Sequence, residues 1–235
     1  MPVRAAKRIV LLLAILGATA CDSLSFGCKV ERLDANVVMP DSFVVAFETS
    51  RGRFDVTART QWSPIGVWRF QQLVNAKYFD GTRFFRVLKN IAQFGLSGDP
   101  AVNAAWRRRC IPDEPVKHAN ARGTISYARG GEHSRSVQLF INRTDNPLLD
   151  ASDGFGFPPI GEVTSGMSVV DSLYSGYGES MAKSGPQYGA EGPRQDSIMA
   201  QGNAYLERGF PKLDFIKTAR VVRQWPAPPN PAAGR

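Results

Sequence analysis

The sequence predicts a mainly β protein with one domain and a closed or sandwiched core, and three observations lead to this fold class. The chain has 235 residues, a length typical of one domain with extensions. Hydrophobic residues make up 43% and charged residues 21%, which argues against disordered, collagenous and coiled-coil classes. Between positions 78 and 163, short β-rich runs alternate with turn residues at uneven spacing. The runs cover residues 82–88, 91–96, 123–128, 137–142 and 160–163.

The N-terminus has the pattern of an export signal. Arg4, Lys7 and Arg8 precede an unbroken apolar run over residues 9–16, and small residues follow up to Ala20. The apolar run is shorter than the roughly 20 residues that a membrane span needs. We therefore expect residues 1–20 to be a removed signal peptide, followed by a tether over residues 21–41.

The end of this signal fits two kinds of processing. Residues 18–20 form an A-x-A site for ordinary cleavage, and together with Cys21 they resemble a bacterial lipobox, in which Cys21 would carry the lipid. We expect an exported lipoprotein in the cell envelope, anchored to the membrane through Cys21. A periplasmic or secreted protein and a cytoplasmic protein with a misleading start are the alternatives. Cys28 and Cys110 are either paired or two free thiols.

The first structured elements are expected to be a hairpin and a helix. Residues 43–47 are β-rich, residues 54–58 alternate, and turn residues lie between them. Ser63 and Pro64 then supply an N-cap and a proline at the first helical position. The helix would run to about residue 78, with its apolar face formed by Val67, Phe70, Leu73 and Val74.

The C-terminal third predicts two more helices and one strand. A helix is expected over residues 166–174, then a loop rich in Gly, Ser and Pro over residues 175–193. A further helix over residues 195–208 would precede a strand over residues 212–222 that closes the core. Residues 224–235 are too rich in proline to pack.

The sequence contains few features of a protein that binds a cofactor, a metal or a nucleic acid. His118 and His133 are the only histidines, and both are expected in loops rather than as metal ligands. Phosphate-binding, serine-hydrolase and zinc-protease motifs are absent from the sequence. Three positive charges of the formal +8 fall in the export signal, and the basic run over residues 107–109 is short and lacks interleaved aromatic residues. We expect no metal, no cofactor and no nucleic-acid partner.

Arg86 interrupts a run of residues suited to a sheet interior, Phe84-Phe85-Arg86-Val87-Leu88. Burying a guanidinium without partners is costly. Strand alternation would put Phe84, Arg86 and Leu88 on one side, with the charge beside apolar neighbours at a barrel mouth or cleft. The alternative is a structural arginine at a strand edge, paired with an acid.

A set of short motifs begins at this arginine and occurs in a defined order: FRV (85–87), QFG (93–95), GD (98–99), GTISYA (123–128), QLFI (138–141), LD (149–150) and GEV (161–163). Together they resemble cyclophilin-type peptidyl-prolyl cis-trans isomerases over roughly residues 42–175. The resemblance implies a closed eight-stranded antiparallel β-barrel capped by two α-helices, within a domain over residues 42–223. An insertion at about residues 176–211 would add the C-terminal helix.

The resemblance also assigns roles to individual residues. Arg86 matches the family's catalytic arginine, and Gln93 and Gln138 match its substrate-positioning glutamines. Phe140 and Leu149 match the apolar pocket that holds the proline ring.

Other positions align with the family but differ from it in residue type or in spacing. Ala128 matches the alanine on the strand whose backbone pairs with the substrate, and Ile91 is the best candidate for a pocket residue because the spacing after the arginine is one residue shorter than usual. Leu148 stands where the family has a tryptophan, which implies weak sensitivity to cyclosporin. Phe157 and Phe85 each replace a histidine, and Phe157 keeps an aromatic wall.

The implied activity is rotation about X-Pro peptide bonds in exported proteins, by a monomer whose partners are proline-containing polypeptides. The alternative is a cyclophilin-fold binding module or chaperone with little catalysis. Such a module would bind proline peptides without accelerating prolyl exchange, so one experiment separates the two readings.

Overall fold

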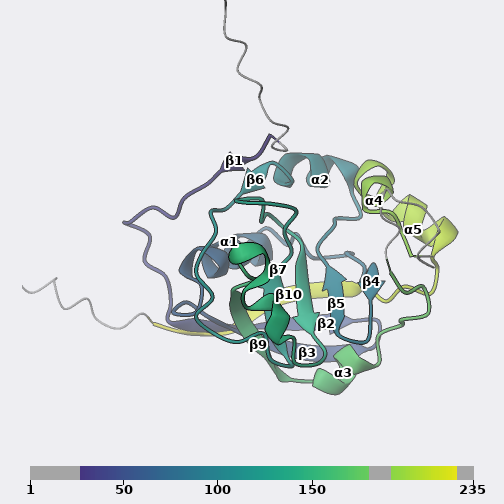
Figure 1. Ribbon diagram of the computed structural model, residues 1–235. Coiled ribbons are helices and arrows are strands. Elements are labelled where there is room, and N and C mark those ends of the chain that lie inside the picture. The colour runs from purple at the N-terminus through teal and green to yellow at the C-terminus, as the bar shows by residue number, and fades with distance from the viewer. Residues whose placement is uncertain (1–26, 180–191, 227–235) are drawn as a thin grey trace, which may run out of the picture.

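The computed structural model describes residues 27–179 and 192–226 of the chain. Eight strands form one antiparallel sheet that curls around a common core, in the order β10-β2-β3-β9-β7-β8-β5-β4 (Figure 1). The mainly β prediction is confirmed. The strands are β2 (Ser42–Thr49), β3 (Gly52–Arg59), β4 (Arg86–Val87), β5 (Ile91–Phe94), β7 (Thr124–Tyr127), β8 (Leu139–Asn142), β9 (Pro159–Ser165) and β10 (Ile216–Trp225).

The predicted hairpin is present as β2 and β3. Thr49 pairs with Gly52, so Ser50 and Arg51 form a two-residue turn. Gly52 has a φ of 126°, a backbone conformation that favours glycine. Every second residue of both strands points into the core, where the Phe47 and Phe54 rings stack with centroids 4.9 Å apart.

The sheet is a half-barrel rather than the closed barrel that the sequence predicted. Its two edge strands, β4 and β10, are joined only through the isolated bridge between Arg83 and Phe215 and flanking backbone hydrogen bonds, such as Phe84 N to Asp214 O at 2.9 Å. The physical reason lies at the start of β4. Phe84 and Val87 both pack in the main core although they are three residues apart, so the two-residue period of a strand is interrupted between them and β4 has only two residues.

Two helices pack on the curled sheet near the predicted positions. α1 (Pro64–Asn75) packs against β3, β9 and β10, and α3 (Met167–Asp171) packs against β3. The cap of α1 differs from the expectation. Ser63 caps no backbone N–H; its hydroxyl donates to the Glu114 carboxylate, which itself accepts from the N–H groups of Ile65 and Gly66 at 2.8 Å. The first turn of α1 is thus capped by a residue 48 positions away.

Three more helices lie together on one side of the molecule (Figure 1). α2 (Pro100–Trp106) was not predicted, although Asp99 and Pro100 provide a cap and a first-turn proline. The single helix expected over residues 195–208 is two helices, α4 (Gln195–Gln201) and α5 (Asn203–Gly209). They are separated at Gly202, whose φ of 59° and ψ of −145° no helix allows.

The described part of the segment expected to be a tether, residues 27–41, contacts the domain. β1 (Lys29–Val30) pairs in parallel with β6 (Arg109–Cys110), and a disulfide joins Cys28 to Cys110. Glu31 bonds the fully buried Arg69 of α1 at 2.5 Å and Arg109 at 2.7 Å. Sequence periodicity could not reveal these contacts, because two-residue strands leave no repeat.

Several predicted features lie outside the described residues: the signal peptide over residues 1–20, Cys21, residues 180–191 of the insertion and residues 227–235 of the proline-rich tail. The first two residues of that predicted tail, Gln224 and Trp225, instead pair with β2 at the end of β10. Among the residues that the structure describes, no helix is long and apolar enough to cross a membrane.

Candidate functional site

Three of the predicted site residues lie on the outer face of the half-barrel, in a row that ends at Ser126 and crosses four strands. Arg86 of β4 pairs with Gln93 of β5, Gln93 pairs with Phe140 of β8, and Phe140 pairs with Ser126 of β7. Cross-strand partners share one face of a sheet. The flanking residues Val87, Ala92, Leu139 and Ile141 belong to the main core, which places the row on the opposite face.

This arrangement corrects one expectation about the arginine strand. Phe84 was expected on the same side as Arg86, but Phe84 is buried in the core while Arg86 faces outward with its side chain 27% exposed. Regular alternation fails here because residues 84 and 85 lie before the strand begins.

Hydrogen bonds connect Arg86 to both predicted glutamines. The Arg86 Nη1 group donates to Gln93 Oε1 at 3.1 Å, and Gln93 Nε2 donates to Gln138 Oε1 at 2.9 Å. Gln93 is only 5% exposed, so its amide is held in place by its surroundings as well as by these bonds. The chain of bonds fixes the orientation of the guanidinium.

Aromatic and aliphatic groups lie around Phe140, away from Arg86. The Phe140 and Phe157 rings meet edge to face with centroids 5.6 Å apart. The Phe157 N–H donates to the Leu149 carbonyl at 2.9 Å, which ties two predicted pocket residues together. The Arg129 guanidinium lies over the Phe157 ring, 5.0 Å from its centroid, in a cation–π contact.

A buried asparagine that the sequence analysis missed holds the loop with Leu149 and Phe157. Asn120 is 1% exposed; its Nδ2 donates to Asp150 Oδ1 at 2.8 Å and to the Phe157 carbonyl at 2.9 Å. Its Oδ1 accepts from the Ser126 hydroxyl at 3.1 Å. Asn120 thus ties the loop to β7, next to the row of site residues. A single asparagine in a loop gives no sequence signal for such a role.

The remaining predicted residues differ in their closeness to Arg86. The Ala128 N–H donates to the Gln138 carbonyl at 2.9 Å, so Ala128 extends the β7–β8 pairing beside the row. Ile91 lies on the same strand face as Gln93, two residues away, and is 8% exposed. Leu148, in the short 3₁₀ helix Pro147–Leu149, is 88% exposed and points into solvent.

One acidic residue at the site had no place in the prediction. The Glu179 carboxylate binds Arg86 through Nε and through Nη2, the latter at 2.7 Å. All three guanidinium nitrogens therefore have partners, Nη1 on Gln93 and the other two on Glu179. Glu179 lies 93 positions from Arg86 in the predicted insertion, so neither spacing nor motif could have indicated it.

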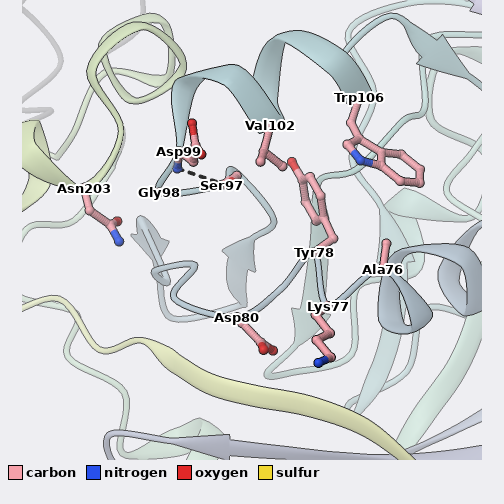
Figure 2. Close-up of a pocket in the computed structure, with 10 residues that line it drawn as sticks. All are labelled: Ala76, Lys77, Tyr78, Asp80, Ser97, Gly98, Asp99, Val102, Trp106 and Asn203. Atoms are coloured by element: carbon pink, nitrogen blue, oxygen red, sulfur yellow. Dashed lines mark hydrogen bonds between the residues drawn. The ribbon is translucent and has the colours of Figure 1, made fainter.

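A cavity of about 350 Å³ lies elsewhere, between the chain that follows α1, the length of α2 and the start of α5 (Figure 2). Tyr78, Trp106 and Asn203 contribute to its walls, and none of the predicted site residues does. Among the described residues, no group of three or more His, Cys, Asp or Glu side chains is arranged to hold a metal ion.

Comparison with known proteins agrees with this fold. The profile of the family described as "Cyclophilin type peptidyl-prolyl cis-trans isomerase/CLD" matches residues 44–199. The chain therefore belongs to the cyclophilin family, and the predicted enzyme class, a peptidyl-prolyl cis-trans isomerase, is confirmed.

Individual relatives give the same result. Peptidyl-prolyl cis-trans isomerase A of Dickeya dadantii (strain 3937) is 34% identical over 139 residues, which cover 55% of this chain and 70% of the relative. Peptidyl-prolyl cis-trans isomerase B of Escherichia coli (strain K12) is 29% identical over 136 residues, covering 55% and 83%. The crystal structure of a cyclophilin-type isomerase from Cryptosporidium parvum shares the fold at a TM-score of 0.55 and 17% identity, covering 77% of this chain and 97% of that one.

Proposed function

We propose that this isomerase catalyses rotation about X-Pro bonds of exported polypeptides, with Arg86 as the catalytic group. The observation that carries the proposal is the hydrogen-bonded chain Arg86–Gln93–Gln138 beside the paired Phe140 and Phe157 rings. One end of this surface offers a guanidinium held by hydrogen bonds, and the other offers an apolar face.

The chemistry requires only a hydrogen-bond donor and a place for the proline. Resonance gives the amide C–N bond its double-bond character and a rotation barrier of about 18–20 kcal/mol. In the twisted transition state the prolyl nitrogen becomes pyramidal and regains its lone pair. A guanidinium N–H that donates to this nitrogen stabilises the twisted state more than the planar ground state, and that difference lowers the barrier.

The neighbouring side chains would keep the substrate in the reactive geometry. Gln93 and Gln138 would orient the guanidinium and the peptide backbone, while Phe140, Phe157 and Leu149 would hold the proline ring in an apolar environment. The Ala128 backbone, Ile91 and the exposed Leu148 would contact residues flanking the proline. No covalent intermediate is needed, because the reaction breaks no bond.

Replacing Arg86 by alanine tests this assignment. We expect Arg86→Ala to lower kcat/KM on an Ala-Pro peptide by about a hundredfold or more, because one preorganised donor is lost from the transition state. Arg59→Ala is the matched control, since Arg59 is an exposed arginine paired with Glu162 on another part of the sheet. If Arg86→Ala keeps full activity and instead lowers the melting temperature, Arg86 is a structural ion-pair residue.

We propose further that the mature protein is exported and anchored through a lipid on Cys21. The basic residues, apolar run and lipobox-like end of the first 21 residues support this. The disulfide between Cys28 and Cys110 adds support, because such bonds persist in oxidising compartments outside the cytoplasm. Clients would then be proteins that fold in the envelope.

Fractionation and mass spectrometry of the full chain expressed in a bacterium test the anchor. We expect the protein in the membrane fraction with an acylated Cys21 at its N-terminus, and Cys21→Ser in the soluble fraction or unprocessed. An unmodified Cys21 at the N-terminus of a soluble protein would show ordinary cleavage, and an intact N-terminus in the cytoplasm would contradict export.

A further inference from the structure

Glu179 holds the edge of the Arg86 guanidinium that Gln93 leaves open. Its two carboxylate oxygens bind Nε and Nη2 in a bidentate pair, the geometry in which arginine binds carboxylates most strongly. A substrate that uses Arg86 as a donor must therefore share this edge with Glu179 or displace it.

The chain on both sides fixes the position of Glu179. Tyr177, two residues earlier, meets the rings of Tyr174 and Phe210 with centroids 5.1 Å from each. The Glu179 carbonyl accepts a hydrogen bond from the Gly192 N–H at 2.9 Å. These contacts hold the backbone of Glu179 in place beside Arg86.

The apolar cluster behind this segment begins at the residue next to Arg86. Phe85, 1% exposed, packs in a cluster with Leu96, Ile198, Leu206 and Leu213, and Tyr177 packs against this cluster. Phe85 stands where the family commonly has a histidine. This replacement gives the insertion an apolar anchor directly behind the arginine, and the insertion in turn delivers Glu179.

The pair is exposed enough to be displaced. The side chains of Arg86 and Glu179 are 27% and 43% exposed, so water and salt screen their attraction and a bound peptide can compete with it. When a substrate displaces Glu179 from Arg86, the Glu179 carboxylate remains beside the bound peptide. A basic side chain near the proline can pair with that carboxylate, whereas an acidic one is repelled by it.

We propose that Glu179 is a specificity-determining residue of the isomerase site: its carboxylate competes with substrates for Arg86 and favours clients with a basic side chain near the proline. This inference rests on the proposed role of Arg86. The preference runs against the charge of the whole chain, which is +8 and by long-range attraction would favour acidic peptides.

The test compares Glu179→Gln with the wild type on three peptides that contain Ala-Pro and differ only in Lys, Ala or Glu at the positions flanking this dipeptide. We expect the variant to raise kcat/KM on the neutral peptide about two- to fivefold, the effect of removing one partly exposed ion pair. The wild type should prefer the Lys peptide to the Glu peptide, and Glu179→Gln should lose most of that preference. Added sodium chloride should also reduce the preference of the wild type for the Lys peptide, because salt screens the charge of Glu179.

Glu207→Gln is the matched control. Glu207 also lies in the insertion and pairs with an arginine of the barrel, Arg83 at 3.0 Å, so this variant changes the net charge equally without touching Arg86. It should keep the wild-type preference. A fall in kcat/KM for Glu179→Gln on all three peptides would overturn the proposal, because Glu179 would then position Arg86 rather than compete for it. Equal peptide preference in wild type and Glu179→Gln would overturn it as well.

The two proposals fail in different ways. If wild type accelerates exchange but Arg86→Ala does so equally, the role of Arg86 is wrong. If the wild type shows no exchange at all, the same three peptides are titrated and their affinities compared by NMR shift changes. Tighter binding of the Glu peptide by Glu179→Gln than by wild type would still support Glu179, and equal binding would contradict it.

Discussion

Gln93 connects the two halves of the site. It accepts from Arg86 and donates to Gln138, and it pairs across the sheet with Phe140. Because Gln93 is almost fully buried, its amide cannot turn away from these partners without leaving a polar group unsatisfied. We infer that it acts as a positioning residue that limits the motion of the guanidinium.

Replacing Gln93 by leucine tests this role. Gln93→Leu keeps the volume of the side chain but removes both hydrogen bonds, so Arg86 loses its inner partner. We expect kcat/KM to fall about ten- to a hundredfold, with the loss mainly in kcat, because misplacement of a catalytic group by about 1 Å has effects of this size. Unchanged kcat with a raised KM would instead indicate a role in substrate binding.

For single residues, the sequence predicts which members of the family motifs lie together, but it does not predict the contacts that are particular to this chain. Arg86, Gln93, Gln138 and Phe140 were expected together and lie together. Glu179 was not expected, because its contact with Arg86 arises from the fold of an insertion without counterpart in the motifs.

Among the elements, the insertion differs most from the expectation. A continuous helix was predicted over residues 195–208, but Gly202 interrupts it. An added Cβ at Gly202 would lie 1.9 Å from the Gly98 carbonyl oxygen, which accepts from the Asn203 N–H at 2.9 Å. The close approach of these two backbone segments decides where the helix ends, and helix propensity does not encode it.

Substituting this glycine tests the interpretation. Gly202→Ala should destabilise the protein by about 1–3 kcal/mol, because both its backbone conformation and the space are denied to alanine. Gly209→Ala is the control, since nothing lies within 4 Å of an added Cβ there. The free energies of unfolding come from denaturant titrations. Equal stability of the two variants would contradict a steric role for Gly202.

The sheet illustrates the same limit of sequence patterns. The hairpin β2–β3 was predicted because long alternating strands carry a clear period. The strand expected over residues 82–88 is only Arg86–Val87, because Phe84 and Val87 both face the main core at a separation of three residues, which breaks the period of two. Tertiary packing, rather than local preference, decided that the barrel remains half open.

For the whole molecule, the segment before the barrel is part of the folded unit. The Cys28–Cys110 disulfide closes 82 positions of chain, and Glu31 neutralises the fully buried Arg69. Burial raises the pKa of the Glu31 carboxyl, but the hydrogen bond from Arg109 and the charge of Arg69 outweigh burial and hold that pKa below its usual value.

This arrangement predicts a pH dependence of stability. A carboxyl with a lowered pKa in the folded state contributes stability above its unfolded value, near 4.5, and that contribution is lost as the pH falls through the folded-state value. Glu31→Gln should cost about 1–3 kcal/mol at pH 7, and its free energy of unfolding should change less than that of the wild type between pH 5 and pH 3. Glu132→Gln, which alters a carboxylate 62% exposed, should follow the wild type. Parallel pH curves for wild type and Glu31→Gln would contradict this account.

The central claim is that Arg86 drives prolyl isomerisation on the outer face of the half-barrel. The most direct measurement is NMR exchange spectroscopy of an Ala-Pro peptide with the protein lacking residues 1–21, beside its Arg86→Ala variant. We predict fast cis–trans exchange with the wild type and its loss with the variant, while both bind the peptide. Equal exchange with both proteins would contradict the role of Arg86, and binding by the wild type without exchange would identify a proline-recognising module instead of an enzyme.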